Sequence, residues 1–337
     1  MSITRNNHYV PQMYLQQWGT SNKVYVYNLL VSNQHVPIWT QQSISRTASM
    51  PNLYTRMSNG NEFDDFEVKF NTDFETPAKI PLQKACNNEQ LTSDDWTVLI
   101  DFILAQYVRT PMFYHISQAP LSDILKSVMG GFNITRRDST LNATNAGDFL
   151  IDETKLIPLS VHLTDIPSDN NHVMAEIEVV RGKNMWLLAI ASVLGDNSPI
   201  RADMHKRKWS IVTSCNGMTW PTSDSPLVVY NPLFPHSRMP GLEREETIFI
   251  FPISPTKAII SKNDGRFPPR WIASETDSDR IKRLIINNAG LYVYSKSEDM
   301  TIPNIRAREV NPKRYKEVYD NYQNWYDNYK TNEAIFL

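Results

Sequence analysis

The sequence has few cysteines and no long apolar run. Cys86 and Cys215 are its only cysteines, and they lie far apart without a CxxC partner. The first residues lack the charged-then-apolar layout of a secretion signal, and apolar runs such as residues 185–194 are shorter than the roughly 20 residues that span a bilayer. We therefore expect a cytoplasmic protein of a reducing compartment, with no membrane-spanning helix.

The sequence also lacks a net charge of either sign. Its 337 residues include 34 basic and 36 acidic side chains, so no global field attracts nucleic acid or an anionic membrane. Any binding of a polyanion would need a local patch. An apolar fraction of 41% with 21% charged residues is typical of a folded chain with a full core.

Familiar catalytic motifs are absent as well. The sequence contains no Walker loop, no GxGxxG after a strand, no HExxH, no EF-hand loop and no GxSxG elbow. No two of its seven histidines are spaced i, i+4 on a convincing helix, as a local zinc site would need. Cys215 lies in a strand-like run, which favours a small buried residue over a nucleophile.

Short β-prone runs at both ends of the chain flank a helical centre. Residues 23–30 and 36–42 predict a hairpin, with a third short strand at 52–57. Strand-like runs return from about residue 208 and end with residues 290–295. We predict an α/β (α+β) fold in which short N-terminal and C-terminal strands surround a central helical region.

Apolar spacing predicts the central helices. Pro77 is expected to end a first helix, whose stripe consists of Phe63, Phe66, Phe70 and Phe74. The clearest helix starts at a Thr92–Ser93 cap and continues to Pro111. Beyond it we expect a helix at 120–129, a polar loop at 130–147 and largely helical structure over 148–194.

The end of the chain carries an aromatic face. Tyrosines spaced by four, three, four and three residues lie on one side of a predicted helix; they are Tyr315, Tyr319, Tyr322, Tyr326 and Tyr329. Most such faces dock on their own domain, and a minority mediate self-association or bind a partner protein. We divide the chain into a single domain, residues 1–300, and this C-terminal helix, residues 301–337.

Two polar residues fall on the buried stripe of the helix that starts at Thr92. Gln106 and Arg109 occupy positions where an apolar side chain is expected. A buried arginine must pair with an anion, because an unpaired one costs roughly 3–5 kcal/mol. The anion is either a carboxylate, for which Glu67 and Glu75 are candidates, or a substrate phosphate. An ion pair that only locks two helices together and a functional site are equally consistent with the pattern.

His8 and Asp224 add titratable groups from distant parts of the chain. Proline holds the residue before it in an extended conformation, so the segment up to Pro11 is fixed instead of fraying. A histidine held there suits general acid–base work, with a free pKa of about 6.5. Asp224 ends a strand-like run before Ser225-Pro226; there an aspartate either folds onto its own backbone in a turn or takes part in a site.

These residues carry a family resemblance. The run His8-Tyr9-Val10-Pro11-Gln12, with Tyr14-Leu15, resembles the N-terminal HYVP hallmark of the mainly bacterial family called domain of unknown function 4238. The family's other recurrent blocks follow in the same order, and the similarity covers about residues 5–296. The blocks are Leu53-Tyr54, Gln106 with Arg109-Thr110-Pro111, Lys208-Trp209, Thr222-Ser223-Asp224-Ser225-Pro226, Phe251-Pro252-Ile253-Ser254-Pro255, and Asn287 before Val293-Tyr294-Ser295.

The resemblance implies that His8, Gln106, Arg109 and Asp224 belong to one constellation. We expect an enzyme that cleaves a phosphodiester or nucleotide: Arg109 holds the phosphate, and His8 acts as general acid or base. In this hypothesis Asp224 and Glu67 orient the histidine or bind Mg²⁺ or Mn²⁺. The expected substrate contacts are Tyr9, Gln12 and Ser223. A role as a toxin or phage-defence effector rests on the resemblance alone. The alternative is a non-enzymatic sensing or interaction module with a structural polar cluster.

Overall fold

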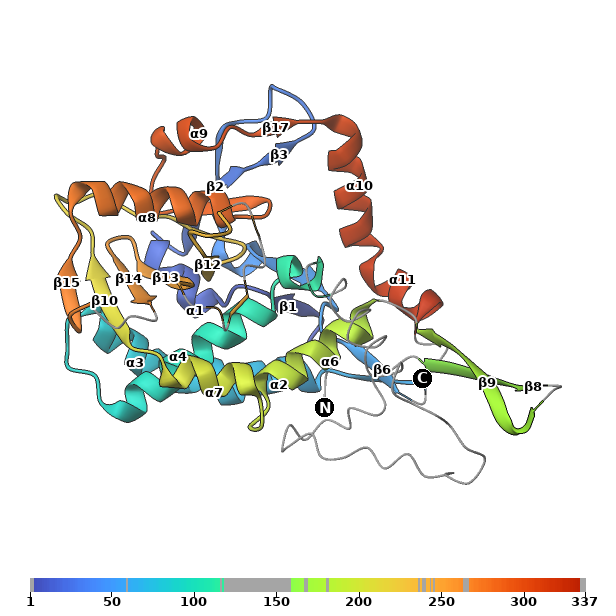
Figure 1. Ribbon diagram of the computed structural model, residues 1–337. Helices are drawn as coiled ribbons and strands as arrows, with labels where there is room; N and C mark the ends of the chain where they lie inside the picture. The colour runs from blue at the N-terminus through green and yellow to red at the C-terminus, as the bar shows by residue number, and fades with distance from the viewer. Residues whose placement is uncertain are drawn as a thin grey trace.

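The computed structural model describes the chain from residue 3 to residue 333 with gaps. It covers residues 3–58, 60–115, 117, 182–235, 237, 241–242, 244, 246–262 and 267–333, and the backbone of 159–166 and 169–179. The predicted helix at 120–129 and the loop at 130–147 lie outside the described residues. The described part of the chain contains both helices and short strands, and the strands pair in several sheets (Figure 1). This confirms the predicted fold class.

Two sheets organise the described part of the chain. In the four-stranded sheet, the C-terminal strand β16 pairs antiparallel with β2, so that the two ends of the family-like region meet. This sheet has the order β11 (Thr222–Ser223), β16 (Tyr292–Ser295), β2 (Lys23–Asn28), β4 (Trp39–Ser43). The five-stranded sheet has the order β12 (Val228–Tyr230), β13 (Ile248–Ser254), β14 (Lys257–Ser261), β10 (Trp209–Thr213), β15 (Arg270–Ile272). The predicted hairpin is confirmed as β2 paired with β4.

The HYVP segment is ordered by pairing and burial. Strand β1 (Asn6–His8) pairs antiparallel with β5 (Ser49–Pro51). Pro11 then precedes the short helix α1 (Gln12–Leu15), which continues as the 3₁₀ turn η1 (Gln16–Trp18). Short elements near it are the 3₁₀ turn η2 (Ile44–Arg46) and the hairpin of β6 (Arg56–Ser58) with β7 (Asn61–Phe63).

A continuous helical stretch replaces the helix that was expected to end at Pro77. It consists of α2 (Asp65–Lys69), the π-helix η3 (Phe70–Glu75) and α3 (Thr76–Cys86). The prediction was wrong because Pro77 follows the π-turn directly, where the i→i−4 hydrogen bond that a proline would break is already absent. Phe66, Phe70 and Phe74 are buried as predicted, whereas Phe63 is 40% exposed and lies in β7.

Helix α4 (Ser93–Val108) forms as its sequence predicted. The Thr92 hydroxyl accepts a hydrogen bond from Asp95 N at 3.1 Å, and the Asp95 carboxylate accepts one from Thr92 N at 2.9 Å, a capping box that closes the first turn. Its interior side packs against the core through Leu99, Phe102 and Ile103. Further helices are α6 (Lys183–Leu194), α7 (Pro199–Lys206) and α8 (Glu275–Asn288).

Residues 148–194 are less helical than predicted. A hairpin of β8 (Leu159–Ile166) and β9 (Asp169–Val179) precedes α6. In β8 the apolar residues Leu159, Val161 and Leu163 alternate with polar neighbours. This period of two is a strand pattern. The helical prediction was wrong over this hairpin because alternation favours a strand, and residues 148–158 lie outside the described residues.

The C-terminal segment consists of four short elements instead of one helix. They are α9 (Thr301–Ile305), β17 (Glu309–Val310), α10 (Pro312–Gln323) and α11 (Trp325–Asn332). Strand β17 pairs in parallel with β3 (Leu30–Val31), and Figure 1 shows α10 and α11 along one side of the molecule. Tyr329 is 2% exposed, so the segment docks on its own chain, while Tyr319 is 52% exposed. Among the described residues, no helix is long and apolar enough to cross a membrane.

Candidate functional site

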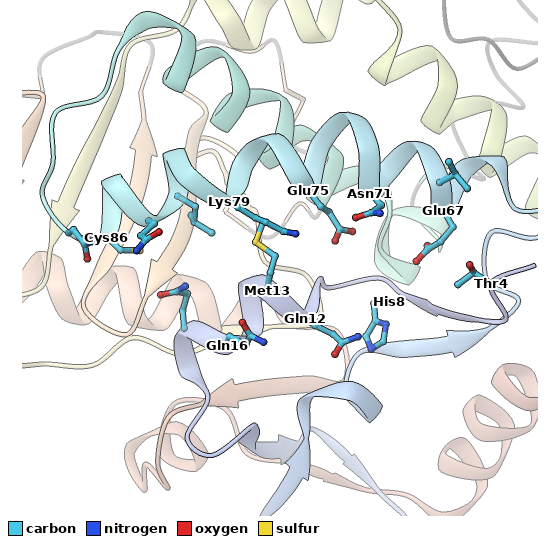
Figure 2. Close-up of a pocket in the computed structure, with 15 residues that line it drawn as sticks. Thr4, His8, Gln12, Met13, Gln16, Glu67, Asn71, Glu75, Lys79 and Cys86 are labelled. Atoms are coloured by element: carbon cyan, nitrogen blue, oxygen red, sulfur yellow. The ribbon is translucent and has the colours of Figure 1, made fainter.

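A cavity of about 880 Å³ lies between the N-terminal segment and the helical stretch α2–η3–α3. One wall comes from β1, α1 and η1, with His8, Gln12, Met13, Gln16 and Gln17. Figure 2 shows the opposite wall, where Glu67, Asn71, Glu75 and Lys79 project from one helical stretch. The HYVP segment and the helix after it therefore form one side of this cavity.

The π-turn keeps the polar wall on one face. Its lining residues follow a spacing of four: Glu67, Asn71, Glu75, Lys79 and Gln83. In a regular α-helix with 3.6 residues per turn, such a row drifts around the axis by about 40° per step. The wider turn between Phe70 and Glu75 reduces that drift. Asn71, Lys79 and Gln83 were not predicted as site residues, although their spacing was visible in the sequence.

Glu67 lines one end of this cavity, and one of its carboxyl oxygens is unpaired within the described part of the chain. Its Oε2 atom is buried and has no hydrogen-bond partner among the described residues. Burial raises the pKa of Glu67 to about 7; the charge of Arg109 opposes this rise, and the charges of Glu75 and Asp64 add to it. Since its pKa lies near neutrality, the carboxyl group can both donate and accept a proton there.

His8 faces the same end of the cavity from the other wall (Figure 2). Burial lowers the pKa of His8 below its usual 6.5, against a hydrogen bond to the backbone of Ser45 that raises it. Its Nε2 atom is buried without a partner among the described residues, so the bond to Ser45 uses the other ring nitrogen. A neutral imidazole that donates to Ser45 leaves the Nε2 lone pair free to accept a proton.

Arg109 lies behind the cavity wall and does not reach the cavity. Its side chain is fully buried, and its guanidinium lies 4.4 Å from the centre of the Phe70 ring. It donates to Glu75 Oε1 at 2.6 Å and to the carbonyl oxygen of His8. The anion that this arginine required is therefore Glu75, one of the two predicted carboxylates. Arg109 fixes both cavity walls relative to each other.

The remaining predicted residues lie apart from this cavity, except for Gln12, which lines it. Gln106 is fully buried in α4, and neither of its amide atoms has a partner among the described residues. The Ser223 hydroxyl donates to the carbonyl oxygen of Ser225 and accepts from the Ser225 N–H group, within one turn. The structure therefore brings His8, Glu67 and Gln12 together, with Arg109 behind them.

Asp224 bonds the backbone of a distant segment, and not the backbone of its own turn as one of the two sequence-based interpretations expected. Its carboxylate accepts hydrogen bonds from the backbone N–H groups of Gly290, Leu291 and Tyr292, at 2.7, 2.6 and 3.2 Å. Burial raises the pKa of Asp224, and these three bonds lower it. Asp224 thus joins β11 to the start of β16 and does not line the 880 Å³ cavity.

Tyr9 lines a second cavity, of about 320 Å³, over the four-stranded sheet. The C-terminal segment covers this cavity through Tyr315 and Tyr322 of α10, and β16 contributes Tyr292 and Tyr294. Tyr9 therefore points away from His8, as consecutive residues of an extended segment do. Within the described part of the chain, no group of three His, Cys, Asp or Glu side chains is placed to hold a metal ion.

Comparison with known proteins agrees with the motif. The chain belongs to the family described as protein of unknown function (DUF4238), whose model matches residues 6–299. The match confirms the resemblance and includes both walls of the larger cavity, while most of the C-terminal segment lies beyond it. No curated protein and no solved structure matches the chain.

Proposed function

We propose that this protein is a hydrolase in which Glu67 acts as general acid and His8 as general base. The observation that carries the proposal is the pair of unpartnered buried atoms, Glu67 Oε2 and His8 Nε2, on opposite walls of one cavity. Their environments move the two pKa values in opposite directions, up for the carboxyl group and down for the imidazole. Such opposed shifts are typical of acid–base pairs in enzymes.

The two groups divide the proton transfers of a hydrolysis. Glu67 donates its proton to the leaving-group oxygen or nitrogen as the scissile bond breaks. His8 Nε2 accepts a proton from the attacking water as the new bond to oxygen forms. The imidazolium then loses this proton to solvent, and the Glu67 carboxylate takes one up, which restores both groups.

The lining of the cavity favours a neutral, hydroxyl-rich substrate over a phosphodiester. Carboxamides of Gln12, Gln16, Asn71 and Gln83 offer both donors and acceptors. Of the described lining residues, only Lys79 carries a fixed positive charge, and the Arg109 guanidinium is enclosed. We therefore propose cleavage of a glycosidic bond, as in a glycoside or a nucleoside, instead of the phosphodiester expected from a phosphate-binding Arg109.

A substrate panel tests this proposal. The full chain is incubated with aryl glycosides, purine and pyrimidine nucleosides, and bis(p-nitrophenyl) phosphate, and product release is measured. We expect turnover of at least one neutral substrate, with unchanged turnover in Asp73→Asn, a control on the same helical stretch whose carboxylate pairs with Lys69 outside the cavity. Turnover of the phosphodiester alone would contradict the substrate class. Absence of turnover across the panel would favour a non-enzymatic binding module.

A further inference from the structure

A carboxylate of the C-terminal segment occupies the start of helix α6. Glu333 accepts hydrogen bonds from the backbone N–H groups of Lys183 and Asn184, both at 2.9 Å. Free N–H groups at the start of a helix, together with the helix dipole, favour an anion. Both donors lie inside the family match, residues 6–299, whereas Glu333 lies outside it.

The chain leaves room for this carboxylate at Gly182. A Cβ atom at that position would lie 2.1 Å from Glu333 Oε1, so any larger residue would displace the oxygen. The backbone of Gly182 is extended, a conformation open to every residue. Space for the bound oxygen, and not backbone conformation, is what requires glycine here.

Two side chains complete the site. Asn184 is fully buried, and its Nδ2 atom has no partner among the described residues, while its Oδ1 accepts from the Tyr329 hydroxyl one helical turn before Glu333. Lys183 is 1% exposed, and its ammonium donates to the carbonyl oxygens of Asn52 and Thr55. An amide donor without a partner in the described part of the chain, and a buried cation held by two backbone carbonyls, therefore belong to the same two residues as the backbone donors.

We propose that the start of α6 is an anion site for carboxylate or phosphate groups, and that Glu333 fills it as an intramolecular ligand. An external anion must then compete with α11 for Lys183 N and Asn184 N. Release of Glu333 would also free the segment whose Tyr322 covers the second cavity. This site shares no residue with the cavity of Glu67 and His8, so the inference is independent of the proposed hydrolase activity.

The test compares anion binding by variants of the full chain. Sodium phosphate and sodium acetate are titrated against sodium chloride at constant ionic strength, and melting temperature is followed. In Glu333→Ala we expect a saturable rise, roughly 2–4 °C at saturation, with phosphate, with acetate or with both. Neither the wild type nor Asp327→Asn, an exposed acid of the same segment, should respond below concentrations that displace Glu333.

A second substitution separates specific binding from general salt effects. Gly182→Ala in the Glu333→Ala background places a methyl group where the anion oxygen would lie, so the response should disappear. An equal response in this double variant, or none in Glu333→Ala, would overturn the proposal. If Glu333→Ala does not fold, hydrogen exchange of the wild type decides: high phosphate should increase exchange in residues 325–332, and unchanged exchange would contradict the inference.

Discussion

Replacing Arg109 with methionine should lower the free energy of unfolding by about 3–5 kcal/mol. Arg109 is fully enclosed and bonds Glu75, the carbonyl oxygen of His8 and, at 3.5 Å, the Tyr54 hydroxyl. Methionine fills much of the volume but leaves the Glu75 carboxylate and a buried carbonyl without their donor. Urea unfolding followed by circular dichroism measures the change.

Arg201→Met is the matched control for Arg109→Met. Arg201 also pairs with two carboxylates, Asp101 and Asp196, but its side chain is 23% exposed and water can replace those partners. We expect Arg201→Met to lower the free energy of unfolding by about 1 kcal/mol or less. A loss in Arg109→Met no larger than in this control, combined with weaker substrate binding, would instead place Arg109 in the substrate site as a phosphate ligand.

Glu67→Gln should reduce turnover of the panel's best substrate by about 10²–10⁴-fold, since that is the usual contribution of a positioned general acid or base. Glutamine keeps the shape of the side chain and removes the proton that the leaving group needs. The wild-type rate should fall as pH rises above about 7, because Glu67 then loses its proton. It should also fall as pH drops below the lowered pKa of His8, which lies under 6.5, because the base is then protonated.

The pH–rate profile of Glu67→Gln shows which residue causes the fall in rate at high pH and which causes the fall at low pH. In Glu67→Gln the residual rate should no longer fall on the alkaline side, and the acidic limb should remain. In Asp73→Asn both limbs should remain. An alkaline limb that persists in Glu67→Gln at the same midpoint would show that another group is the acid.

Local patterns in the sequence predicted the elements that local forces determine. Helix α4 carries its own capping box and a regular apolar face, and strands β2 and β4 are near neighbours in the sequence that pair antiparallel. The prediction failed at Pro77, because a π-turn just before it removes the hydrogen bond that this proline would break. The polar wall was missed although its spacing of four is visible in the sequence, because a row with that spacing drifts around the axis of a regular α-helix and the π-turn that reduces the drift was not predicted.

The candidate site was predictable only in part. The buried position of Arg109 required an anion, and Glu75 proved to be that anion, but no pattern could decide between a protein carboxylate and a phosphate. The opening motif identified His8, and position beside the phenylalanine stripe identified Glu67. Asp224, like His8 and Arg109, belongs to the family's blocks. Its carboxylate, however, accepts from three backbone donors about 66 residues away in the chain.

Titration of the Glu67 carboxyl group decides whether this residue can serve as the general acid. The full chain is labelled with ¹³C at the glutamate carboxyl carbons, and the Glu67 signal is assigned by its absence in Glu67→Gln. Its chemical shift is then followed with pH. We expect a midpoint near pH 7, because burial raises the pKa of Glu67 to about 7. A midpoint near the ordinary glutamate value of 4.5 would show a solvated carboxylate and would contradict its role as the acid.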